Sequence, residues 1–110
     1  MNRKVNIDYE ESTGNIFADL GLDNADELLT RAQLGHTVRM ILDKRKLKQR
    51  EIGKLLDIKQ PEVSKLMNGR YTLFSQERLF AFLNKLDQKV TVKIAPRRRG
   101  EKLQEVVLAG

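Results

Sequence analysis

The pattern of apolar and polar residues predicts a long amphipathic helix in the first half of the chain. Between residues 25 and 45, apolar residues recur at the three- and four-residue spacing of one helix face, namely Leu28, Ala32, Val38, Ile41 and Leu42. Asp23 or Asn24 can cap the start of this helix. Acidic residues at 26 and 27 lie in its first turn, where the helix dipole favours negative charge. We therefore expect a helix over residues 25–45.

Two shorter helices joined by a tight turn follow in residues 49–69. Apolar side chains are spaced so that helices over 49–56 and 60–68 would pack on each other, and they are Ile52, Leu55, Leu56, Ile58, Val63 and Leu66. A small residue, Gly53, lies where the two helices would touch. Asp57 falls in the turn and tolerates the left-handed backbone that such turns need. This spacing is typical of a helix-turn-helix, whose second helix is normally offered to the DNA major groove.

A further helix and then a change of period complete the patterned part of the chain. Ser75 can cap a helix over residues 75–86, whose buried stripe would comprise Leu79, Phe82, Leu83 and Leu86. After it, residues 90–95 alternate apolar and polar side chains as a β-strand does, and Pro96 ends the run. No second convincing strand precedes this one.

A single strand leaves its backbone ladder groups unpaired. Pairing with the same strand of a second subunit is the economical solution, and it predicts a homodimer joined through Val90, Val92 and Ile94. Pairing with a different protein, or with residues 103–108 of the same chain, would also satisfy the strand.

These elements divide the chain into four predicted parts. Residues 1–22 form a flexible arm, in which Ile16, Phe17, Leu20 and Leu22 make a short docked turn. Residues 23–88 form the helix-turn-helix DNA-binding domain, residues 89–96 the dimerisation strand, and residues 97–110 a basic tail. The expected fold class is an all-α domain of four to five helices with one C-terminal strand that pairs across a dimer.

The distribution of charge favours a partner that carries phosphates. The chain of 110 residues has a formal net charge of +6 and a sequence pI of about 9.8. Residues 1–45 carry a balance of −2, whereas residues 46–72 and residues 73–110 each carry +4. The basic excess therefore begins at the predicted DNA-reading unit.

The same composition argues against several other classes of protein. There is no cysteine and one histidine, His36, so we expect no metal site and no cofactor. Glu10, Glu11 and His36 are the best catalytic candidates, but the two acids are adjacent in a predicted arm and the histidine stands alone, so we expect no enzyme. No apolar run is long enough to span a membrane. We expect a cytoplasmic, nucleoid-associated protein.

If the helix over 60–68 enters the major groove, its first turns face the bases. The predicted base-contacting residues are Gln60, Pro61, Ser64 and Lys65. Glutamine can pair with adenine N6 and N7, and lysine suits guanine O6 and N7. The predicted phosphate-contacting residues surround them, and they are Gln49, Lys46, Lys48, Lys59, Asn68, Arg70 and Tyr71.

These residues resemble a known family, the Xre/lambda-repressor-like helix-turn-helix proteins. The matching positions are Gln49, Glu51, Ile52, Gly53, Leu56, Ile58, Gln60, Val63, Ser64, Leu66, Asn68 and Gly69. The chain departs from the family pattern at Gly53, where alanine is common, and at Asp57, where glycine is common. The resemblance implies that Gln49 clamps a phosphate and that residues 60, 61, 64 and 65 face bases.

A narrower resemblance covers most of the chain. Residues 14–22, 25–29 and 74–86, with the strand after them, look like small HigA-like antitoxins and related Xre regulators. This resemblance implies a homodimer that represses its own operon at a palindromic operator. It also implies a RelE/HigB-like toxin partner, an mRNA-cleaving ribonuclease, which the acidic segment 8–27 could meet. The alternative is a stand-alone or phage-type Xre regulator without a toxin.

Overall fold

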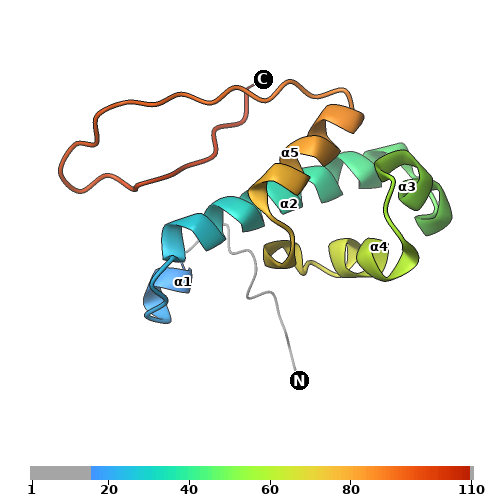
Figure 1. The fold of residues 1–110 in the computed structure, drawn as a ribbon, viewed down its shortest axis with the longest axis horizontal. Coiled ribbons are helices and arrows are strands. Elements are labelled where there is room, and N and C mark those ends of the chain that lie inside the picture. Colours follow the sequence, from blue (N-terminus) through green and yellow to red (C-terminus); the bar gives the residue numbers. More distant parts are fainter. Residues whose placement is uncertain (1–15, 110) are drawn as a thin grey trace.

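The computed structural model describes residues 16–109, and five α-helices and one 3-10 helix lie among them (Figure 1). Their bounds are α1 Ile16–Asp19, α2 Ala25–Arg45, α3 Gln49–Leu56, α4 Gln60–Met67, η1 (the 3-10 helix) Tyr71–Leu73 and α5 Gln76–Lys85. The helices predicted at 25–45, 49–56, 60–68 and 75–86 are confirmed to within one residue at each end. The first 15 residues of the predicted arm lie outside the described residues.

Helix α2 is the axis of the molecule, with α5 beside it and α3 and α4 at one end (Figure 1). Asn24 occupies its N-cap position without a capping hydrogen bond from the side chain. Charged side chains stabilise the helix ends instead, because acidic residues lie in the first turn and Lys44 and Arg45 lie in the last turn, where each interacts favourably with the helix dipole. Even this longest helix is too polar to cross a membrane, and no other helix within residues 16–109 qualifies.

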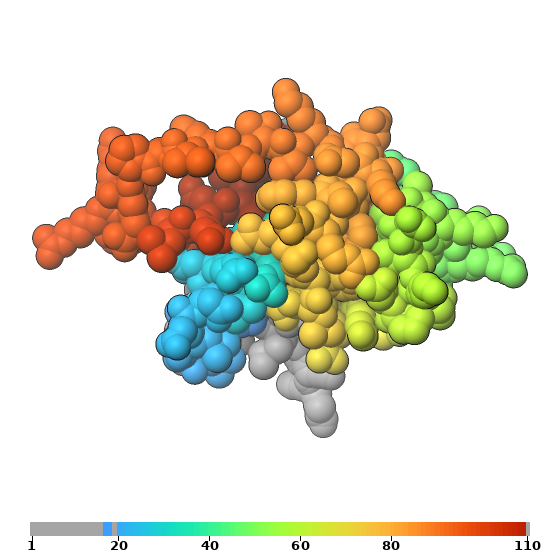
Figure 2. Space-filling view, in the orientation of Figure 1, coloured from blue at the N-terminus to red at the C-terminus, as the bar shows by residue number. Residues whose placement is uncertain are grey.

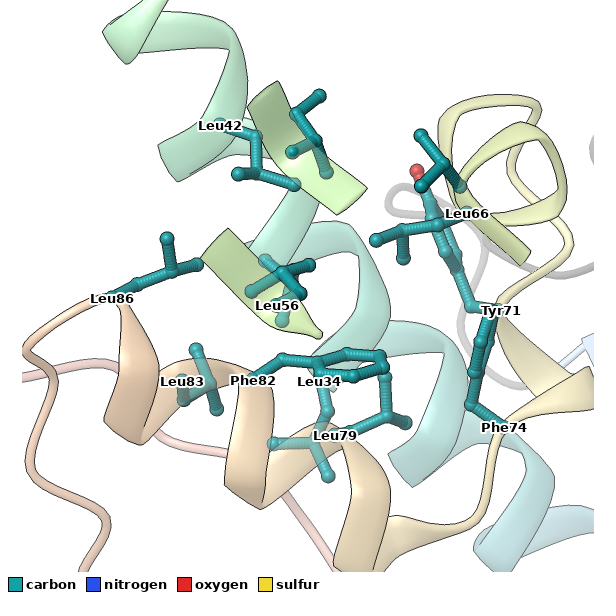
Figure 3. Packing of buried hydrophobic residues seen from close by; sticks show 13 residues of the cluster. Leu34, Leu42, Leu56, Leu66, Tyr71, Phe74, Leu79, Phe82, Leu83 and Leu86 are labelled. Atoms are coloured by element: carbon teal, nitrogen blue, oxygen red, sulfur yellow. The ribbon is translucent and has the colours of Figure 1, made fainter. Parts of the chain in front are cut away.

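The main core forms where α2 and α5 meet the helix-turn-helix (Figure 3). Helix α2 contributes Leu34, Val38 and Leu42, and the rest of the buried cluster comprises Ile52, Leu56, Val63, Leu66, Tyr71, Phe74, Leu79, Phe82, Leu83 and Leu86. The stripe predicted on the last helix is therefore in the core. The Phe74 and Phe82 rings meet edge to face, with centroids 5.5 Å apart. The core holds α3 and α4 in a fixed orientation against α2.

A glycine allows α2 and η1 to approach closely. A Cβ atom added at Gly35 would lie 2.7 Å from Tyr71 Cδ1, and it would lie closer still to Cβ and Cγ of the same side chain. The Tyr71 ring lies against α2 and is 6.2 Å from the His36 ring, centroid to centroid. The absence of a side chain at position 35 is therefore a packing requirement.

A small second cluster joins α1 to α2. Phe17 is buried together with Leu29 and Ala32, whereas Leu20 and Leu22, which follow α1, are exposed. Gly21 between them has a positive φ of 74° and turns the chain from α1 toward α2. Among the described side chains of α1, Phe17 is the one buried against α2.

The strand predicted over residues 89–96 does not form in the single chain. Within the described part of the chain no residue is assigned to a β-strand, and residues 88–98 carry neither helix nor turn. The reason is physical, because a strand is defined by its backbone ladder and no neighbouring segment supplies one. In Figure 1 the segment leaves the end of α5 as a wide loop and returns toward the helices.

Candidate nucleic-acid interface

The turn between α3 and α4 packs directly against Gly53. Asp57 adopts the left-handed conformation, with φ 58° and ψ 50°, as the sequence predicted. The Ile58 N–H donates to the Gly53 carbonyl oxygen at 2.9 Å. A Cβ atom at position 53 would lie 3.0 Å from the Ile58 carbonyl oxygen and 3.5 Å from Val63 Cγ2. The close contact inferred for Gly53 is therefore a contact with the turn as well as with α4.

The first residues of α3 and α4 meet at the surface. The Gln60 side-chain amide donates to Gln49 Oε1 at 2.6 Å, and both side chains are exposed. At the start of α3, the Lys48 N–H donates to Glu51 Oε1 at 2.7 Å, which satisfies one free donor of this helix end. The two glutamines that the sequence assigned to DNA thus form one hydrogen-bonded pair.

The other residues predicted to face bases lie on the same helix with different exposure. Pro61 and Lys65 are exposed, and Ser64 is half-buried. The Ser64 hydroxyl oxygen accepts from the Asn68 amide at 3.2 Å. Val63 and Leu66 point into the core, so α4 is divided into a buried face and a polar face.

Of the residues predicted to contact phosphates, all but one are exposed. Those at the surface are Lys46, Lys48, Gln49, Lys59, Asn68 and Arg70. Lys59 is the N-cap residue of α4 with an extended backbone and no side-chain capping bond. Its ammonium is thereby available to solvent beside a helix end that itself favours anions.

The structure argues against the phosphate contact predicted for Tyr71. Its side chain is 4% exposed and belongs to the core between α2 and η1. A phosphate contact would require moving this ring from its place against Gly35. The sequence did not reveal this, because a tyrosine after a basic residue in a loop is equally compatible with surface and core.

Two basic residues that the sequence analysis did not single out lie next to the predicted site. Arg50 and Lys54, one turn apart on α3, line a shallow groove with Gln49, Asp57 and Gln60. Their spacing of four residues on the polar side of a short helix was a usable signal. They extend the positive surface from α4 onto α3.

An ion pair fixes the start of α4 to α5. The Arg78 guanidinium donates to Glu62 Oε2 at 2.5 Å and lies over the rings of Phe74 and Phe82, 5.4 and 5.5 Å from their centroids. The hydrogen bond from Arg78 lowers the pKa of Glu62, and Glu62 in turn raises the pKa of Arg78. Because Glu62 lies in the first turn of α4, the pair helps to position the helical turn that contains Gln60 and Pro61.

We expect the stability of the fold to decrease in acid partly through Glu62. A carboxylate with a lowered folded pKa stabilises the fold above its unfolded pKa of about 4.3, and the stabilisation is lost as the pH falls through the folded value. Because both side chains are partly exposed, the pair contributes about 0.2–1 kcal/mol. Urea unfolding at pH 7 and pH 3 should show a smaller pH dependence in Glu62→Gln than in the parent. Equal pH dependence in both proteins would contradict this role.

Of the three catalytic candidates named from the sequence, the structure describes only the histidine. Glu10 and Glu11 lie outside the described residues, and His36 packs beside the Tyr71 ring. Among residues 16–109 no group of three His, Cys, Asp or Glu side chains could hold a metal ion.

Comparisons with known proteins agree with this geometry. A family model described as a helix-turn-helix domain matches residues 16–95. A solved structure described as an XRE-family transcriptional regulator superposes with a TM-score of 0.68 at 32% sequence identity, and the match covers 79% of this chain and 98% of that one. None of the curated proteins matches this sequence at a significant level. The chain therefore belongs to the Xre family of helix-turn-helix proteins and is a DNA-binding transcriptional regulator.

Proposed function

We propose that this protein is a sequence-specific repressor that reads duplex DNA with α4. The observation that carries the proposal is the hydrogen bond between the exposed Gln49 and Gln60 side chains at the adjoining starts of α3 and α4. In this pair Gln60 uses one amide hydrogen and keeps a donor and an acceptor free. That remaining set matches adenine N7 and N6 in the major groove. The proposal therefore assigns an adenine to Gln60.

The rest of the polar face of α4 completes the proposed reading surface. Lys65 would donate to guanine O6 or N7, Pro61 would contact a thymine methyl group, and Ser64 could bond several bases. The exposed residues around them would hold the backbone, and they are Gln49, Lys46, Lys48, Lys59, Asn68 and Arg70. Tyr71 is left out of this set because it is buried.

Selection from random duplex DNA with the full chain tests the proposal. A repressor of this kind should enrich one motif, and a dimer should enrich two inverted half-sites about 34 Å apart, which is one helical turn. Enrichment of no motif would overturn sequence-specific reading. A motif without inverted repeats would support sequence-specific recognition by α4 but would contradict binding as a dimer.

Phosphate contacts predict a change in salt dependence. Each phosphate neutralised by a cation contributes about 0.9 to the slope of log K against log salt concentration. We expect Lys59→Ala and Arg70→Ala each to weaken binding to every sequence and to flatten that slope by roughly 0.9. Fluorescence anisotropy titrations from 50 to 300 mM salt, roughly the range over which such slopes are measured, would check it. An unchanged slope in either variant would remove that residue from the phosphate set.

The proposed repressor acts as a homodimer that binds a palindromic operator. Support comes from residues 89–96, which alternate as a strand, make no backbone ladder in the single chain and expose Val92 and Ile94. Pairing of this segment with its copy across a two-fold axis would satisfy both sets of backbone groups.

We further propose that the repressor is the antitoxin of a type II toxin-antitoxin operon, with a RelE/HigB-like ribonuclease as partner. The support is the resemblance to HigA-like antitoxins together with an acidic and apolar surface at the start of α2. There Leu20 and Leu22 are exposed beside the acidic residues Asp23, Asp26 and Glu27. A basic ribonuclease would find both charge and apolar area on this surface.

The product of the neighbouring reading frame is the probe for the antitoxin role. If it is a short basic protein, calorimetry should show binding to the parent and at least tenfold weaker binding to Leu20→Ser with Leu22→Ser, the loss of about 1.4 kcal/mol or more. Met40→Ser, an exposed apolar residue further along α2, is the matched control and should bind normally. Absence of binding by the parent would favour a stand-alone regulator.

A further inference from the structure

Residues 88–109 resemble a β-hairpin in having two extended arms joined by a tight turn, but the arms are not hydrogen-bonded to each other. Residues 98–101 form a hydrogen-bonded turn, in which the Glu101 N–H donates to the Arg98 carbonyl at 3.1 Å and the Arg98 N–H donates to Glu101 Oε1 at 2.6 Å. Gly100 supplies the positive φ of 85°. The turn sends the chain back toward the helices, so two arms, residues 88–97 and 102–109, lead from and to the helical body.

The two arms do not pair with each other. The returning arm is held by the helices instead, since the Leu103 N–H donates to Asp26 Oδ2 at 3.0 Å and the Gln76 amide donates to Gln104 Oε1 at 3.1 Å. Val106 is half-buried against the core. Figure 2 shows an opening between the two arms, and no side chain fills it in that view.

Both arms expose large apolar side chains to solvent. Val92 is 66% exposed and Ile94 is 92% exposed on the outgoing arm, and Leu103 and Val107 are above 70% on the returning arm. An extended segment with such side chains and free backbone groups is a template for another strand. The branched apolar residues of the outgoing arm, Val90, Val92 and Ile94, are all at even positions, so they would share one face of a strand.

We infer that the opening is occupied by the outgoing arm of a second copy of this chain, an inference that rests on the proposed homodimer. Each outgoing arm would pair with its copy at the two-fold axis and with the returning arm of the partner. The sheet would then have the order returning arm, partner's outgoing arm, outgoing arm, partner's returning arm. Two strands with a third strand between them lie roughly 10 Å apart. A partner strand between the two arms of one chain would therefore account for their separation.

Charge complementarity supports this order. On the face opposite Val92 and Ile94, the outgoing arm carries Lys89 and Lys93. The half-buried valine of each arm, at position 90 or 106, packs against the core, so in extended arms the even positions of both would face the helices and Glu105 would share the face of the two lysines. Opposite charges on neighbouring strands stabilise a sheet, whereas outgoing arms paired only with each other would leave these lysines without an acidic neighbour, because residues 88–97 contain no Asp or Glu.

Disulfide trapping tests the inference, and the absence of native cysteine makes it clean. A chain with Glu105→Cys and a size tag is mixed with an untagged chain carrying cysteine at 89, 91 or 93, which covers the possible registers. At one register we expect a covalent dimer of tagged and untagged chains under mild oxidation. In the matched control, the untagged chain carries its cysteine at the exposed position 84 near the end of α5 (Asn84→Cys). This chain should not cross-link to the tagged Glu105→Cys chain.

The outcomes separate the inference from the dimer itself. A dimer in sedimentation without any cross-link to position 105 would overturn the interleaved order and leave the homodimer standing. A monomer in sedimentation would overturn both. Intramolecular cross-linking of a Thr91→Cys, Glu105→Cys chain would show a simple hairpin and overturn the inference.

A truncated chain that ends at Lys102 gives an independent measurement. It keeps the outgoing arm and the turn but lacks the returning strand. Interleaving predicts a dimer dissociation constant raised about tenfold or more, since several cross-strand pairs are lost at both edges. An unchanged dissociation constant would contradict the inference.

Discussion

Substitution of both Gln60 and Lys65 by alanine should remove most of the preference for the selected operator and leave the fold intact. Each good bidentate contact contributes about 1–3 kcal/mol of discrimination, so the double variant should lose roughly 2–6 kcal/mol, a factor of about 30 or more. Both side chains are exposed, and the α4 residues that reach the core are Val63 and Leu66. The measurement is the ratio of dissociation constants for the operator and a scrambled duplex.

Lys59→Ala is the matched control for this experiment. It removes one positive charge, as Lys65→Ala does, but at the N-cap of the same helix and at a position proposed to contact phosphate. It should weaken binding to operator and scrambled DNA equally and leave their ratio unchanged. Retention of the full ratio by a folded Gln60→Ala, Lys65→Ala variant would show that other residues read the bases.

Gly35→Ala should destabilise the fold markedly, although alanine is the better helix former. The new methyl group would overlap the near end of the Tyr71 side chain, which a rotation about its own bonds cannot remove. Overpacking of this kind costs about 1–3 kcal/mol. Urea unfolding measures the change, and a shift of the midpoint with an unchanged slope would identify a loss of native stability.

Truncation of the tyrosine separates the overlap from other effects of the substitution. In a Tyr71→Gly background the Cβ atom that would lie closest to the new methyl group is gone with the rest of the side chain, so Gly35→Ala should be neutral or stabilising by up to about 1 kcal/mol from helix propensity. Gly53→Ala is a useful comparison, because its nearest non-local neighbour lies at 3.0 Å. Wild-type stability of Gly35→Ala would contradict the close approach of α2 and η1.

The helices could be predicted from the sequence because each has a local signal. The stripe at 79, 82, 83 and 86 and the capping Ser75 lie within one element, and Ser75 does accept from the Arg78 N–H. Asp57 was recognisable in the same way, since few residues tolerate its turn. The Glu62–Arg78 ion pair was not predictable, because its partners are 16 residues apart and nothing local joins them.

The candidate site divides in the same way. Periodicity placed Gln60, Pro61, Ser64 and Lys65 away from the core, and each is at least partly exposed. It could not say that Gln60 would bond Gln49, that Arg50 and Lys54 would join them in one groove, or that Tyr71 would be buried. These facts depend on how α3, α4 and η1 cross, which no single segment encodes.

The sequence by itself determined the order, length and polarity of the four longer helices, because caps, turns and helical periods are local properties, whereas it did not predict α1 and η1 as helices. It also located the alternating segment 89–96, although a strand needs a neighbour and the single chain supplies none. The tertiary structure decided which polar residues meet, that Gly35 must lack a side chain, and that the two C-terminal arms stand apart. Those are properties of packing, which depends on residues distant in the chain being brought together.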